Sequence, residues 1–196
     1  VPSHRMHGIP FAALRSAATG RPLLDEHMIS IVADAAALIE RHSNGVRRAN
    51  RVLVVDASPA APGAHAALRA VQRETARIVH LYPQAVMLRR PHKEDVLEKL
   101  TDYAIVHLSA HGFSDFAQPL LSYLHLPSKG DGESLYAGEI RKRDLSNVWL
   151  VFLSACSGAA RTRALRPQSA GLADAFAAAG AQYVIAALWP IDDAQA

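Results

Sequence analysis

Short runs of apolar residues alternate with helical patterns along most of the chain. The run RVLVVDA at residues 51–57 is almost continuously aliphatic, which is typical of a strand buried on both faces. After the Pro62-Gly63 break, residues at three- and four-residue spacing predict one face of a helix: Leu68, Val71, Thr75, Ile78 and Tyr82. Further strands are predicted at 85–90, 103–109, 148–154 and 183–188, with further helices over 96–100 and 172–177. This succession predicts an α/β fold with a mostly parallel sheet.

The pattern changes between Gln118 and Leu145. Apolar residues there flank the turn-rich stretch PSKGDG at 127–132. Two apolar runs around such a turn predict a hairpin-like excursion and not another crossover helix.

The uncharged run at 175–191 approaches the length of a membrane span. Gly180 and Gln182 interrupt it, so we interpret it as a buried helix, a glycine turn and a buried strand. Ser169 is a suitable N-cap for this helix, and Gly180 is suited to end it. We therefore expect no membrane span.

Composition and charge narrow the class of protein. The chain has 196 residues, of which 50% are hydrophobic and 20% charged, which fits one globular domain and excludes a disordered or collagen-like chain. Lys and Arg number 21 against 18 Asp and Glu, a balance too even to indicate a nucleic-acid partner. The single cysteine excludes an internal disulfide and favours a reducing compartment, and we see no secretory leader.

Two predicted strands end in residues that can carry chemistry. The strand at 103–109 leads into Ala110-His111-Gly112, and the strand at 148–154 leads into Ala155-Cys156. The carboxyl ends of parallel strands meet at one edge of a sheet, so the imidazole and the thiol can form a base and nucleophile pair. The backbone N–H groups of Gly112 and Cys156 can stabilise the oxyanion that forms when the thiolate attacks a carbonyl.

The same residues also have an ordinary structural interpretation. A lone cysteine in an apolar strand is often an inert small hydrophobe, and a lone histidine at a strand end is often a surface residue. From the residues alone, both interpretations stay open.

Three segments in this order resemble the CHAT domain family. They are HLSAHG at 107–112, LSACSG at 153–158 and GLADAFAAAGAQYVIAALWPIDD at 171–193. The opening segment 1–14 is similar to the family's first strand and turn, and 51–57 to its central strand. CHAT domains are caspase-like peptidase domains, related to separase and often attached to tetratricopeptide repeats.

The resemblance implies a caspase–hemoglobinase-like three-layer α/β/α sandwich with a mostly parallel central sheet. It further implies a cysteine endopeptidase in which Cys156 is the nucleophile, His111 the base and acid, and the amides of Gly112 and Cys156 the oxyanion hole. The substrate is then a protein or peptide, and no cofactor is required. Family context implies control by an attached repeat or sensor module and a bacterial, cytoplasmic setting.

The chain departs from the family pattern in two places. Ser157 leads straight to Gly158, where many members have one further small hydroxyl residue, and this alters the turn that forms the oxyanion hole. The chain also begins within a strand-like segment and ends at residues 192–196. We therefore expect residues 1–196 to be a single CHAT domain, truncated at both ends.

Other candidate residues have weaker support. Asp115, Trp189, Asp192 and Asp193 are candidates for a substrate pocket, in which a carboxylate favours Lys or Arg before the cleaved bond. Their alternative roles are a turn cap for Asp115, core for Trp189 and a helix start for the aspartate pair. His107 lies four residues before His111 without a helical His-Glu-x-x-His pattern, so we expect no metal site. We expect His107 to orient the loop beneath His111 by a hydrogen bond or to be packed.

Two rival functions remain. One is a catalytically silent, caspase-like interaction or regulatory module that kept the two residues. The other, a nucleotide-binding α/β domain, is disfavoured because neither a G-x-G-x-x-G loop nor a Walker-type lysine follows any predicted strand.

Overall fold

A computed structural model describes residues 9–29, 51–58, 69–115, 117–127, 132–155 and 171–187. The chain divides into two compact units, Val1–Gly45 with Arg163–Gln168, and Val46–Thr162 with Ser169–Ala196. In the first unit, the structure describes a 3-10 helix, η2 (Phe11–Ala13), and a short helix, α1 (Leu23–Glu26). Of the opening segment 1–14, only residues 9–14 are described, and they form η2 and its flanks.

The second unit is built on a five-stranded parallel sheet in the order β2-β1-β3-β7-β8. The strands are β1 (Val52–Asp56), β2 (Val86–Arg89), β3 (Ile105–Ser109), β7 (Leu150–Ser154) and β8 (Tyr183–Ala186). Each falls within a predicted strand. The predicted helices are also confirmed as α3 (Arg69–Leu81), α4 (Lys93–Lys99) and α6 (Leu172–Ala178).

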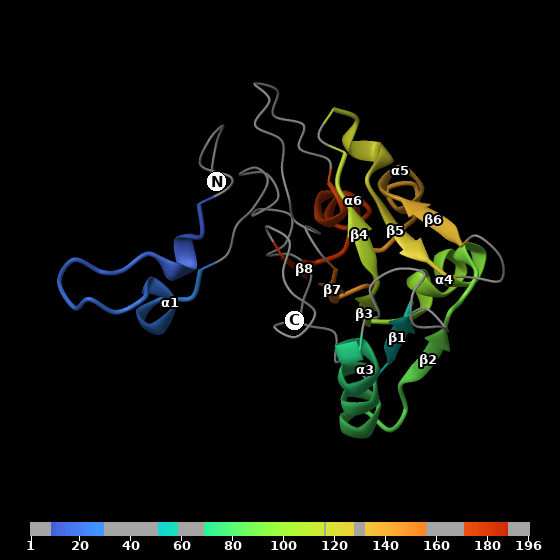
Figure 1. Ribbon diagram of the computed structural model, residues 1–196, viewed down its shortest axis with the longest axis horizontal. Helices are drawn as coiled ribbons and strands as arrows, with labels where there is room; N and C mark the ends of the chain where they lie inside the picture. Colours follow the sequence, from blue (N-terminus) through green and yellow to red (C-terminus); the bar gives the residue numbers. More distant parts are fainter. Residues whose placement is uncertain are drawn as a thin grey trace. The chain divides into compact units, whose positions relative to one another are not determined.

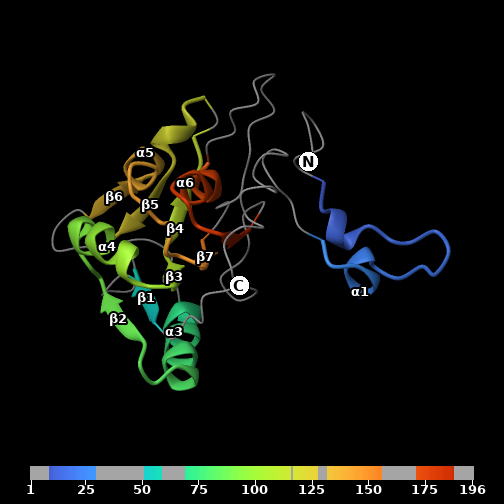
Figure 2. The same cartoon turned by 180° about the vertical axis from the view of Figure 1, so that it is seen from behind.

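Helices cover both faces of this sheet. One face packs against α3, whose Val71 and Thr75 are buried. Side chains of the other face join α4 and α6 in the main hydrophobic core, which includes Leu53, Val106 and Val151. In Figure 1, α3 lies below the strands, while α4, α6 and the short helix α5 (Ala137–Ile140) lie above them, and Figure 2 shows the same from behind. The predicted α/β sandwich with a parallel central sheet is confirmed.

The predicted hairpin-like excursion is a separate antiparallel sheet. It has the order β4-β5-β6, with β4 (His111–Phe113), β5 (Tyr123–Leu126) and β6 (Glu133–Tyr136). Alternation of side chains sends Leu124 and Leu135 into the main core. Strand β4 was not predicted, because three residues that include a glycine carry no strand pattern of their own. It forms because β5 supplies its pairing partner.

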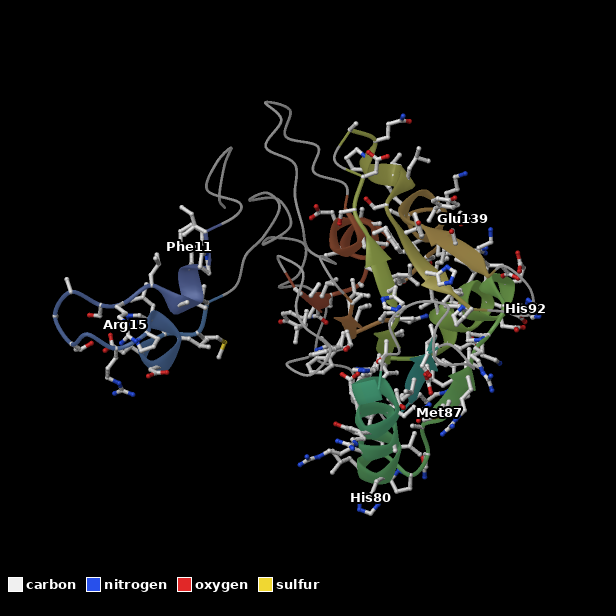
Figure 3. The ribbon with its side chains drawn as sticks, in the orientation of Figure 1. Phe11, Arg15, His80, Met87, His92 and Glu139 are labelled. Carbon is white, nitrogen blue, oxygen red and sulfur yellow. The ribbon has the colours of Figure 1, made fainter. Side chains whose placement is uncertain are left out.

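Charged contacts tie this small sheet to α4. The His92 Nδ1 atom lies 2.8 Å from Glu133 Oε1, and the Lys93 backbone N–H donates to Glu133 Oε2 at 2.6 Å. The Lys93 ammonium lies 2.9 Å from Glu139 Oε1 at the start of α5. Figure 3 labels both His92 and Glu139 on the right of the second unit, with Glu139 above His92. These pairs are partly exposed, so each contributes little to stability.

The apolar run at 175–191 contributes a helix, a glycine turn and a strand, as predicted. Gly180 has φ +110°, and the N–H groups of Gly180 and Ala181 donate to the carbonyls of Ala177 and Phe176. This is a Schellman ending, which favours glycine at the position with positive φ. The N-cap residue of α6 is Gly171, so the prediction of Ser169 as N-cap is wrong. Within the part of the chain that the structure describes, no helix is long and apolar enough to cross a membrane.

The last strand differs from the prediction in burial. Tyr183 and Ile185 are 43% and 50% exposed, and β8 is the last strand of this sheet in the part of the chain that the structure describes. An apolar run therefore predicted the strand correctly but overstated how far it is buried.

Replacing Gly180 with alanine should destabilise the second unit. A Cβ atom at this position would lie 3.0 Å from the backbone N of Ser146 and would be held at φ +110°. Such strain costs about 1–3 kcal/mol, and the close backbone contact adds to it. Urea denaturation should therefore give a lower midpoint for Gly180→Ala than for the wild type.

Gly138→Ala is the matched control. Gly138 lies in helix α5, and its added Cβ would lie 3.4 Å from the Leu120 carbonyl oxygen, which is an ordinary van der Waals contact. Alanine is preferred over glycine in helices, so the free energy of unfolding should change by less than about 1 kcal/mol. Equal denaturation midpoints for the two variants would contradict the role assigned to Gly180.

Candidate functional site

Strands β3 and β7 are neighbours and end at the same level. Their paired residues run from Ile105 with Leu150 to Ser109 with Ser154. The last contact between them is the hydrogen bond from the Ala110 N–H to the Ser154 carbonyl, at 3.3 Å. The chain segments that follow the two strands therefore begin about 4.8 Å apart, at the carboxyl edge of the sheet.

His111 and Gly112 do not lie in a loop, as the sequence suggested, but begin strand β4. The chain leaves the parallel sheet after Ser109 and enters the antiparallel sheet at His111, which pairs with His125 of β5. Both His111 and Gly112 are half-buried. The chain changes sheets between His107, which lies in β3, and His111, which lies in β4.

An aromatic row lies beside His111 on the outer face of the small sheet. Phe113, Tyr123 and Tyr136 are direct neighbours across the three strands, two residues along from the row of His111 and His125. The rings of Phe113 and Tyr123 stack with centroids 4.8 Å apart, and Tyr123 meets Tyr136 edge-on at 5.6 Å. Phe113 is 46% exposed and Tyr136 37% exposed. The face that carries His111 thus also carries accessible aromatic surface.

Asp115 has the contacts of a turn cap. Its Oδ1 accepts hydrogen bonds from the backbone N–H groups of Ala117, at 2.9 Å, and Gln118, at 2.8 Å. Its own N–H donates to the Ser122 hydroxyl. A carboxylate bound to two backbone donors orients the chain after β4, which matches the structural alternative for this residue.

Four of the predicted site residues lie outside the residues that the structure describes. They are Cys156, Trp189, Asp192 and Asp193. The described segment 132–155 ends at Ala155, directly after β7 and one residue before Cys156.

A cluster of polar side chains lies under the carboxyl edge, on the face covered by α3. Glu74 of α3 accepts hydrogen bonds at Oε2 from the hydroxyls of Ser109, at 3.0 Å, and Ser154, at 3.1 Å. Its Oε1 lies 3.3 Å from Nε2 of His107. We call Glu74, His107, Ser109 and Ser154 the edge cluster.

The hydrogen bonds of the edge cluster indicate which ring nitrogen of His107 carries a hydrogen. The Ser109 hydroxyl donates to Glu74, so the Ser109 oxygen is the acceptor for His107 Nε2, which lies 3.0 Å away. His107 therefore carries hydrogen on Nε2. The ring of His107 also stacks on Phe152, with centroids 5.1 Å apart. His107 is thus both hydrogen-bonded and packed, with Ser109 and Glu74 as its polar partners. Its role in orienting the chain beneath His111 stays a prediction.

Glu74 is negatively charged in this setting. Burial raises the pKa of its carboxyl group, but the hydrogen bond and the charge of His107 and the two serine hydroxyls outweigh it. The pKa of Glu74 therefore lies below its ordinary value of 4.5.

The sequence contains one signal for the edge cluster, the position of Glu74 in the predicted helix. Glu74 lies three residues after Val71 and just before Thr75, so it belongs to the inward-facing stripe of the predicted helix. A charged residue in such a stripe indicates a polar partner in the interior. That the partners are Ser109 and Ser154, 35 and 80 residues further on, requires the tertiary structure.

No metal site appears in the described part of the chain. A search of those residues finds no group of three or more His, Cys, Asp or Glu side chains that could hold a metal ion. The edge cluster contains one carboxylate and one imidazole, and its other two members are serines that donate to Glu74.

Stability should depend on the ionisation of Glu74. Its pKa is lower in the folded than in the unfolded state, so its contribution is complete above the unfolded pKa and is lost as pH falls through the folded pKa. Glu74→Gln should therefore flatten the decline of the free energy of unfolding below about pH 4.5 relative to the wild type. Urea denaturation at a series of pH values measures this, and identical slopes for the two proteins would contradict it.

Comparison with protein-family models identifies the family of this chain. The family model of the CHAT domain matches residues 1–196, and both compact units therefore fall within it. A search of curated proteins finds no match. CHAT domains form a caspase-like peptidase family, and the parallel sheet with helices on both faces is consistent with their fold. Because the match extends over the whole chain, the chain belongs to the CHAT domain family.

Proposed function

We propose that the chain is a cysteine endopeptidase domain that cleaves a protein substrate through Cys156 and His111. Membership in a caspase-like peptidase family supports this class of reaction. The observation that carries the proposal is the register of β3 and β7. Ser109 pairs with Ser154, and each lies two residues before a member of the dyad.

The proposed reaction proceeds in two steps. In the first, His111 accepts the Cys156 proton and the thiolate attacks the scissile carbonyl carbon, which places negative charge on the carbonyl oxygen. The N–H groups of Gly112 and Cys156 donate to that oxyanion. The C–N bond then breaks, and His111 gives its proton to the departing amine, leaving a thioester on Cys156.

In the second step, water hydrolyses the thioester. His111 removes a proton from the attacking water, and the tetrahedral intermediate collapses with departure of the sulfur. Sulfur recovers its proton from His111, and the new carboxyl terminus is released. The atoms balance with water as the only co-reactant, so no cofactor is required.

The aromatic row supports a polypeptide as the substrate. Phe113 lies two residues beyond His111 on the same face of β4, about 7 Å along the strand. An extended peptide that crosses His111 along β4 would pass over the rings of Phe113 and Tyr123. We therefore expect an apolar or aromatic side chain in the substrate about two residues from the cleaved bond.

Substituting either member of the dyad should remove activity. Cys156→Ala deletes the nucleophile, so cleavage should fall to background, and His111→Ala should lower kcat about 10²–10⁴-fold by loss of proton transfer. The measurement is cleavage of a peptide library by the longest natural protein that contains this chain, with products identified by mass spectrometry.

His80→Ala is the control for the histidine substitution. His80 is exposed in the last turn of α3, at the far tip of that helix in Figure 3, and its loss should leave cleavage unchanged. Cleavage retained by Cys156→Ala would overturn the proposal. No cleavage by a folded wild-type protein, with or without its attached modules, would favour the silent interaction module instead.

A further inference from the structure

The geometry points to Glu74 as a positioning residue that joins the ends of β3 and β7 and thereby sets the spacing of the His111 and Cys156 segments. This inference deepens the proposed function and rests on it. It assigns a role in the reaction to a side chain on α3, whose carboxylate binds the hydroxyls of Ser109 and Ser154, each two residues before a member of the proposed dyad.

Glu74 forms a bridge between the hydroxyls of Ser109 and Ser154, at the ends of β3 and β7. Among the described residues, Ser109 and Ser154 are the last ones paired between β3 and β7, and beyond them the Ala110 N–H donates to the Ser154 carbonyl. After that point the chain from β3 turns away into β4 of the other sheet. A single oxygen of Glu74 holds both serine hydroxyls, so the last pair is held by side chains as well as by the backbone.

The two hydrogen bonds from the serine hydroxyls to Glu74 are directional and are made to a charged acceptor. Ser109 is fully buried, and the Glu74 side chain is 25% exposed, so the carboxylate is largely shielded from water. Hydrogen bonds to a charged acceptor are about twice as strong as those between neutral groups. An apolar side chain could pack α3 on the sheet equally well, but it would not fix the angle of either strand end.

The edge cluster is not a serine catalytic triad. In a serine triad, the hydroxyl and the carboxylate bind different nitrogens of the imidazole. Here both Ser109 Oγ and Glu74 Oε1 lie near Nε2 of His107, and the Ser109 proton is directed to Glu74. Ser109 is also inaccessible to a substrate. The cluster therefore acts through the strand ends and not on the substrate.

The test measures the dyad directly, because Cys156 is the only cysteine in the chain. Its rate of alkylation by iodoacetamide reports the reactivity of that thiol, independently of any peptide substrate. Glu74→Ala should lower this rate and kcat by about 10- to 100-fold while leaving KM within about twofold, because the dyad is misplaced but the peptide still binds. The Ala110 amide should exchange its hydrogen at least about tenfold faster, as measured by NMR.

Conservative variants separate positioning from general stability. Ser154→Ala removes one of the two hydrogen bonds to Glu74 and should lower kcat and the alkylation rate of Cys156, but less than Glu74→Ala does. Ser154→Thr keeps the hydroxyl and should retain both kcat and the alkylation rate. Ser154 is half-buried and not fully enclosed. Gln72→Ala, at an exposed position of the same helix, is the control and should match the wild type.

Each outcome decides the inference. If Glu74→Ala lowers only the thermal midpoint, with normal kcat, alkylation and Ala110 exchange, Glu74 is merely structural and the inference is overturned while the peptidase stands. If Cys156→Ala cleaves as well as the wild type, the proposed function fails and the positioning role fails with it. That second case is recognised from the Cys156→Ala control alone.

Discussion

The parallel pairing of β3 with β7 is the constraint on which the rest of the second unit depends. It brings together two segments that lie 45 residues apart in the sequence and aligns their last residues, Ser109 and Ser154. Pairing of this kind is expensive in chain entropy, because a long connection must be closed before any contact forms. The protein uses that connection for the β4-β5-β6 sheet and α5, whose apolar side chains complete the core on one face.

The two faces of the parallel sheet have different chemistry. On one face, the core is apolar and holds α4, α6 and the small sheet. On the other, the residues at the carboxyl edge are polar, with Asp56, Ser109 and Ser154 side by side across β1, β3 and β7. A carboxylate from α3 satisfies the two serines. Apolar burial thus holds the layers together, and directional hydrogen bonds are concentrated at the edge from which the dyad segments leave.

The change of sheet between Ser109 and His111 places the histidine on a different support from the strand that precedes it. His111 begins β4, and its neighbours across the small sheet are His125 and the aromatic row. Gly132, with φ +81°, lies against the ring of His125, and a Cβ there would come within 2.5 Å of that ring. The position of His111 therefore depends on how well the hairpin β5-β6 is held, and not only on β3.

The sequence by itself determined most of the secondary structure, because aliphatic runs and helical spacing reflect burial that every such fold imposes locally. It also determined the family, from three segments whose order and residues are specific. Only the tertiary structure decided that His111 lies in a strand, that Tyr183 and Ile185 of β8 are exposed and that Glu74 joins Ser109 to Ser154. Each of these depends on partners far away along the chain, and a pattern read over neighbouring residues carries no information about which distant residue completes a pair.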